Sequence, residues 1–109
     1  MTVPDLDKSC SLYSEVLLIR FTDQKYAYEA YIRDPSQEIQ SASVSGPYGS
    51  SELTYNLYSN KPGMWWTDPN IEVWFNNPPG PTTWTFTIKF KNDSTCTEIK
   101  ETTTWEWAE

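Results

Sequence analysis

The stretch Trp84-Thr85-Phe86-Thr87-Ile88-Lys89-Phe90 decides the fold class of this chain. Every second residue is aromatic or aliphatic and the residues between them are polar; the apolar set is Trp84, Phe86, Ile88 and Phe90. An extended segment places such a set on one face, and aromatic and β-branched residues suit a half-buried pleated surface. The alternation therefore predicts a β-strand that directs these four side chains into a core.

This strand is expected to form a long hairpin with the residues that follow it. Lys91-Asn92-Asp93-Ser94 supplies turn chemistry, because Asn and Asp tolerate left-handed backbone and hydrogen-bond local amides. A Thr-rich run begins at Thr95 and reads as the returning strand. We expect Thr102–Trp107 to extend it, with Trp105 and Trp107 on one face.

Turn-forming residues divide the rest of the chain into short runs of strand length. We expect strands over Glu15–Phe21, Tyr26–Arg33, Glu38–Ser45, Glu52–Ser59 and Ile71–Phe75. The first two resemble a second hairpin, although a helix is the alternative for the second. The run from Glu38 needs a bulge, or Ala42 in the core, to keep both Ile39 and Val44 inside.

About seven strands with regular turn signals and no convincing helix predict an all-β fold. We expect an antiparallel β-sandwich, with a partly open β-barrel as the alternative. Residues 1–14 read as a lead-in that is partly tied down around Leu12 and Tyr13. Residues 15–109 read as a single domain, which at this size buries roughly two-thirds of its unfolded surface.

Composition indicates an aromatic core and limits the partners. Apolar residues make up 38% of the 109, but six Trp, seven Tyr and four Phe are among them, and each buries a large area. The net charge of −7 argues against nucleic acid and against anionic membrane surfaces. No run approaches the roughly 20 apolar residues that span a bilayer.

The N-terminus and two cysteines are the features of the sequence that bear on cellular location. The first residues lack the basic and apolar regions of a signal peptide. The chain is therefore either cytosolic or a mature or excised module of a secreted or cell-surface protein, and we favour the second. Cys10 and Cys96 are either separate buried thiols or a disulfide. We favour the disulfide, which requires Cα atoms within about 7 Å.

Parts of residues 39–100 resemble a known class of module. Ile39–Pro47, the strand from Trp84 and the turn Asn92-Asp93-Ser94-Thr95 are similar to segments of immunoglobulin-like or fibronectin type III-like modules of bacterial secreted and surface proteins. The resemblance implies a β-sandwich and an extracellular location, and it implies no catalytic residue. The turn departs from the Asp-Gly that is usual there, and the antibody-type Cys…Trp…Cys spacing is absent.

Residue types exclude most catalytic chemistry. The chain contains no histidine, so Ser–His and Cys–His dyads and histidine-bound metals are impossible. Paired carboxylates remain, with Asp5/Asp7 and Glu98/Glu101 as candidates, and a small carboxylate-based hydrolase is the last alternative for function. We expect no cofactor and no metal. Calcium is the alternative, at the loop carboxylates Asp5, Asp7, Asp34, Asp68 and Asp93.

The excess of aromatic residues is the main functional signal. Neighbouring residues of a strand point to opposite faces, so Trp65 and Trp66 cannot both enter one core and we expect one to be exposed. Trp74 is expected to face away from Val73 and Phe75. With Tyr48 and Tyr58, these rings could form a sugar-stacking platform or a protein-binding patch.

These observations favour a non-catalytic function. We expect a structural, spacer or interaction module of a larger secreted or cell-surface protein. The alternative is a carbohydrate-binding or adhesion module that uses its exposed Trp and Tyr, with a polysaccharide or another protein domain as partner.

Overall fold

The computed structural model describes residue 10 and residues 12–108, and this part of the chain is all-β, as the sequence predicts. It contains nine strands and no helix. The strands are β1 Ser14–Arg20, β2 Lys25–Arg33, β3 Ile39–Gly46, β4 Gly49–Tyr55, β5 Met64–Thr67, β6 Ile71–Trp74, β7 Thr82–Phe90, β8 Thr95–Thr102 and β9 Trp105–Trp107.

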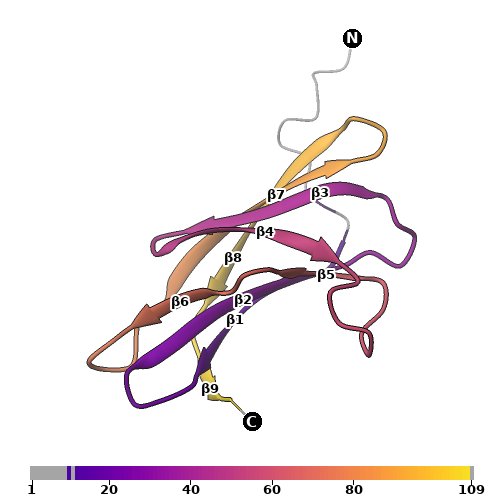
Figure 1. The fold of residues 1–109 in the computed structure, drawn as a ribbon. Helices are drawn as coiled ribbons and strands as arrows, with labels where there is room; N and C mark the ends of the chain where they lie inside the picture. The colour runs from indigo at the N-terminus through magenta and orange to yellow at the C-terminus, as the bar shows by residue number, and fades with distance from the viewer. Residues whose placement is uncertain (1–9, 11, 109) are drawn as a thin grey trace.

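The strands form one sheet that curls into a half-barrel (Figure 1). Its order is β8-β7-β3-β4-β5-β2-β1-β9, and β6 pairs with β2 beside β5. β8 and β9 stand at the two ends of this order yet are separated only by Thr103 and Thr104, so the curled sheet brings its ends together. The expected sandwich of about seven antiparallel strands is not confirmed, because β1 and β9 pair in parallel.

The two predicted hairpins are confirmed and supply most of the core. β7 pairs with β8, and β1 pairs with β2, both antiparallel. Trp84, Phe86 and Ile88 are fully buried and Phe90 is partly buried, whereas Thr87 and Lys89 are exposed. From β2, the alternate residues Tyr26, Tyr28, Ala30 and Ile32 complete the same aromatic core.

β3 contains the bulge that the spacing of its apolar residues requires. Ile39 pairs with Phe90 and Ser41 with Lys89, so Gln40 is the extra residue. The bulge resets the alternation, and Ile39, Ala42 and Val44 are all buried. Both features that the sequence suggested, a bulge and Ala42 in the core, are therefore present.

Two expected strand ends are wrong, and β4 also begins at Gly49, three residues before the expected start. β4 ends at Tyr55 and not at Ser59, because Asn56 adopts a left-handed conformation with φ 55° and its N–H bonds to the carbonyl of Met64. The last strand does not run through to Trp107: it breaks after Thr102, and β9 leaves β8 to pair with β1.

The turns gather at two ends of the half-barrel (Figure 1). One end carries the β1–β2 turn, the β3–β4 turn, the β6–β7 loop and β9; we call it the aromatic end, defined by Phe21, Tyr48, Trp74, Phe75 and Trp107. The opposite end carries the β2–β3 and β4–β5 loops and the β7–β8 turn.

A disulfide ties Cys10, ahead of β1, to the last hairpin. Cys10 and Cys96 are bonded, with Cα atoms 5.7 Å apart, which lies within the separation expected above. The Cys10 N–H also donates to Oε2 of Glu98 at 3.0 Å, and Leu12 packs on the core. The opposite end of the half-barrel is thereby closed between β1 and β8.

Candidate functional site

Trp65 and Trp66 lie on opposite faces of β5, but the expectation that one of them is exposed is wrong. Trp65 enters the core and is 9% exposed, while Trp66 on the outer face is only 3% exposed. The reason is that residues 56–63 fold back over the outer face of the sheet. Neither ring is left in water, so Trp65 and Trp66 do not form the exposed binding platform that the sequence predicted.

The cover over Trp66 is itself aromatic and cationic. The ring of Tyr58 meets Trp66 edge-on at 5.3 Å, and Nζ of Lys61 lies 4.7 Å above the indole. On its other side Trp66 packs on Tyr31 at 4.7 Å, and Tyr31 stacks on Tyr13 at 5.9 Å. Tyr58 thus belongs to this outer row and not, as expected, to the surface that includes Trp74.

Trp74 is the most exposed large apolar residue of the described chain, at 69%. It faces outward on β6 as the alternation predicts, because Ile71 and Val73 of the same strand are turned toward the core. Its partner across the strands is Lys25, whose Nζ bonds to Oε2 of Glu72 at 2.9 Å and lies 5.8 Å from the ring of Phe21. The Trp74 ring therefore stands in a charged and aromatic setting.

Tyr48 reaches the same end from the β3–β4 turn, but it packs on the core side of the sheet, whereas Trp74 faces outward. Its ring contacts Phe75 edge-on at 5.2 Å and stacks on Tyr28 at 5.7 Å. Tyr28 in turn packs on the buried Trp84 at 4.6 Å. A continuous line of rings thus connects the partly exposed Tyr48 with the centre of the core.

Trp107 also lies at the aromatic end, although the sequence did not indicate it as a binding residue. It is 54% exposed and lies edge-on to Trp105 at 5.7 Å. The guanidinium of Arg20 sits over Trp105, Trp107 and Tyr26 at 4.8, 4.5 and 5.4 Å, geometry that favours cation–π attraction. The alternation Trp105-Glu106-Trp107 was a visible signal for one shared face, but the position of that face depends on the pairing of β9 with β1.

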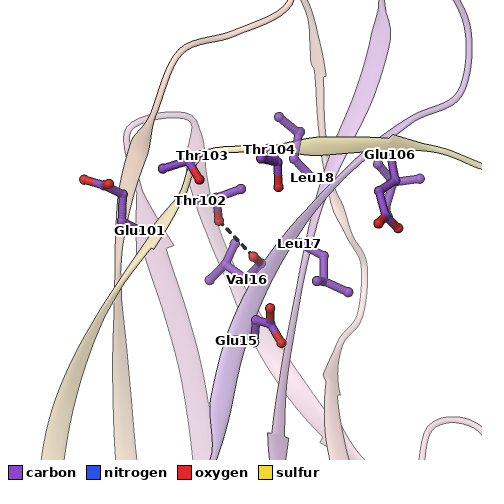
Figure 2. Close-up of a pocket in the computed structure, with 10 residues that line it drawn as sticks. Glu15, Val16, Leu17, Leu18, Glu101, Thr102, Thr103, Thr104 and Glu106 are labelled. Carbon is purple, nitrogen blue, oxygen red and sulfur yellow. Dashed lines mark hydrogen bonds between the residues drawn. The ribbon is translucent and has the colours of Figure 1, made fainter.

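A pocket of about 240 Å³ lies between β1 and the β8–β9 connection (Figure 2). The hydroxyl of Thr102 donates across it to the carbonyl of Val16 at 2.9 Å. Glu15, Glu101 and Glu106 line it, and Figure 2 shows the Glu101 carboxylate directed away from the other two. Oε2 of Glu15 already accepts from the hydroxyls of Tyr13 and Tyr31. We interpret this pocket as the seam where the curled sheet meets itself.

Three phenols have perturbed acidity. Burial, followed by the hydrogen bond to Glu15, raises the pKa of Tyr31 well above its usual range. Burial also raises the pKa of Tyr58, aided by the nearby charges of Glu29 and Asp68, and burial raises the pKa of Tyr28. These shifts stabilise neutral phenols, and they come mainly from packing.

Asp34 has a structural role in place of the calcium ligation that was considered for it. It is fully buried, and its carboxylate accepts from the N–H of Glu38 at 2.8 Å, of Ile39 at 3.1 Å and of the Trp65 indole at 3.0 Å. Asp68 and Asp93 lie in two other turns, and Asp5 and Asp7 fall outside the described residues. Within residues 10 and 12–108, no group of three or more Asp, Glu or Cys side chains is placed to hold a metal ion.

Comparisons with protein-family models, curated proteins and solved structures find no significant match to this chain. The resemblance to immunoglobulin-like and fibronectin type III-like modules therefore stays a prediction. In the part of the chain that the structure describes, no helix is long and apolar enough to cross a membrane.

Proposed function

We propose that this chain is a non-catalytic recognition module that binds a polysaccharide through the aromatic end of its half-barrel, with Trp74 as the main contact. The observation that carries the proposal is the 69% exposure of Trp74 on a short strand whose other apolar residues face the core. Water contact of so large a ring is costly, and burying it on a ligand recovers that free energy.

The surroundings of Trp74 hold its strand in place before any ligand arrives. β6 is paired with β2 over four residues, and the Phe75 N–H bonds to the Gln24 carbonyl at 2.9 Å. Phe75 packs on both Tyr26 and Tyr48. Because these contacts already order the strand, little conformational entropy remains to be lost on binding.

The chemistry around Trp74 favours a sugar over a protein partner. The cores of protein interfaces are depleted of charged residues, whereas Trp74 stands beside the Lys25–Glu72 ion pair and is followed closely by the amides of Asn76 and Asn77. A sugar ring offers an apolar C–H face to an indole and hydroxyls to the charged and amide groups around it. The aromatic end matches that mixture.

A secreted or cell-surface location is part of the proposal, as is the absence of catalysis. Disulfides persist mainly in oxidising compartments, and the Cys10–Cys96 bond supports such a location. The lack of histidine removes the commonest acid–base group, and Glu98, one of the carboxylates considered for catalysis, accepts a hydrogen bond from the Cys10 N–H. An immunoglobulin-like module of a larger protein is consistent with these features.

A spacer role is the second candidate, and the packing of the outer aromatic row favours it. Trp66, Tyr31 and Tyr58 could have formed a binding surface, but they cover one another. In a spacer, the same packing would account for the aromatic content without any ligand.

The proposal is tested by co-sedimentation with insoluble cellulose, chitin, xylan and mannan. The wild-type chain is expected to bind at least one of them, and Trp74→Ala is expected to weaken that binding at least tenfold, which is about 1.4 kcal/mol. Ile99→Ala is the matched control, because Ile99 is 68% exposed on β8, a strand that pairs neither with β6 nor with its partner β2. Equal binding by both variants would exclude Trp74 as the contact, and no binding by the wild type would favour the spacer role.

A further inference from the structure

A second pocket, of about 230 Å³, lies at the end of the half-barrel opposite Trp74. It is formed where the β2–β3 loop, the ends of β3, β4 and β5, and the β7–β8 turn meet. Ile39, Tyr55 and Trp65 provide its apolar floor, and Gln37, Gln40 and Lys91 provide its polar rim. We propose that this pocket binds one neutral sugar ring, independently of the Trp74 surface.

The floor is aromatic and fixed in place. The rings of Tyr55 and Trp65 pack on each other, with centroids 5.4 Å apart and planes inclined at 50°. The indole N–H of Trp65 donates to the buried carboxylate of Asp34, which is itself held by the backbone N–H groups of Glu38 and Ile39. The ring is therefore oriented before a ligand binds, as effective binding sites require.

Both glutamines of the rim come from irregular backbone. Gln37 has a φ of 55°, a left-handed conformation that is uncommon for residues other than glycine. Gln40 is the extra residue of the β3 bulge, and bulges often redirect a side chain beside a functional site. Two neighbouring departures from regular structure thus supply the two amides of one pocket, and strained backbone of this kind clusters at ligand sites.

The donors and acceptors of the rim fit a ring of hydroxyl groups. Each glutamine amide both donates and accepts, and the Lys91 ammonium donates, which matches hydroxyls that do both. The one carboxylate that lines the pocket, Asp34, is already committed to three N–H donors. With the Asp34 carboxylate committed, the groups left for a ligand are two amides and the Lys91 ammonium, all of which can bond to sugar hydroxyls.

Size and shape select a single puckered ring. The volume is below the roughly 300–1,000 Å³ of pockets that take drug-sized ligands, so the pocket admits one ring and not a chain of several. The inclined rings of Tyr55 and Trp65 do not form the parallel slot in which a flat nucleobase stacks best. The end unit of a glycan meets both conditions.

The test is a titration of the ¹⁵N-labelled full chain with methyl glycosides of glucose, galactose, mannose, xylose and N-acetylglucosamine. At least one is expected to shift the Trp65 indole signal and the side-chain amide signals of Gln37 and Gln40. Gln40→Ala is expected to weaken that binding at least fivefold and, because Gln40 is exposed, to leave the fold intact. Trp74→Ala is expected to bind the glycoside as the wild type does, which separates this pocket from the proposed polysaccharide surface.

Three results would overturn the proposal. The first is that no glycoside shifts the Trp65 signal up to its solubility limit. The second is that Gln40→Ala and Trp74→Ala lose binding to the same extent, which would place the sugar elsewhere. The third is that adenine, added as a flat comparison ligand, shifts these signals while the glycosides do not.

Discussion

The indole ring of Trp84 lies directly against the α-carbon of Gly46, and a β-carbon at position 46 would overlap it. β3 and β7 are adjacent in the sheet, and Gly46 ends β3 just before the β3–β4 turn that carries Tyr48. The absence of a side chain at Gly46 therefore allows the largest core residue to reach the aromatic end.

Gly46→Ala is expected to destabilise the protein by about 1–3 kcal/mol, the usual cost of overpacking. Trp84 is fully buried and cannot move aside without displacing Tyr28. Urea unfolding measures the effect. Gly80→Ala is the control, because no atom lies near its added β-carbon, and it should be neutral or slightly stabilising. A Gly46→Ala protein as stable as the control would contradict the close packing of Trp84 on Gly46.

Loss of the disulfide should lower the free energy of unfolding more than Gly46→Ala or Thr102→Val does. Cys10 and Cys96 enclose 86 positions of sequence, and in the chain-entropy model a loop of that length contributes about 4–5 kcal/mol. Urea unfolding of Cys10→Ser/Cys96→Ser against the oxidised wild type measures this. A difference below about 1 kcal/mol would show that the bond does little to restrict the unfolded chain.

Thr102→Val should destabilise the seam of the half-barrel. The buried Thr102 hydroxyl is a hydrogen-bond donor to the carbonyl of Val16, and leaving a buried acceptor without its partner costs about 1–3 kcal/mol. Thr97→Val is the matched control, since Thr97 is exposed on the same strand. Hydrogen exchange of the β1 and β9 amides should increase in Thr102→Val alone; equal protection in both variants would count against the seam.

Stability should fall at alkaline pH partly through Tyr31. Its pKa is raised in the folded state by burial and by Glu15, so the folded protein retains the phenol proton more strongly than the unfolded chain does. The resulting stability is complete below the unfolded pKa of about 10 and is lost as the pH rises through the folded pKa. Tyr31→Phe should lose stability less steeply than the wild type above about pH 10; parallel loss in urea unfolding would exclude this contribution.

Sequence pattern alone predicted the features that depend on the residues of a single strand or turn. The alternation from Trp84 gave the buried face of β7, and the five-residue spacing of Ile39 and Val44 indicated the bulge that the structure places at Gln40. The turn at Asn92–Ser94 follows in the same way, with Asp93 at φ 71°.

The burial of Trp66 and the position of Trp107 depend on long-range contacts, which the sequence pattern did not predict. Trp66 is buried because residues 56–63 fold back, which depends on the left-handed Asn56 and on Gly63 at φ 75°. The exposed aromatic end includes Trp107 only because β9 pairs with β1, a partner more than 80 positions away. Neither arrangement leaves a periodic signal in the sequence.

Polysaccharide recognition by Trp74 can be followed in a ¹H–¹⁵N spectrum of the six indole N–H groups. The signals are assigned by Trp→Phe variants, and the protein is titrated with soluble oligosaccharides of cellulose, chitin, xylan and mannan. At least one oligosaccharide is expected to shift the Trp74 signal, while the signals of the buried Trp66 and Trp84 stay in place. An unchanged Trp74 signal with every oligosaccharide would contradict polysaccharide recognition by the aromatic end.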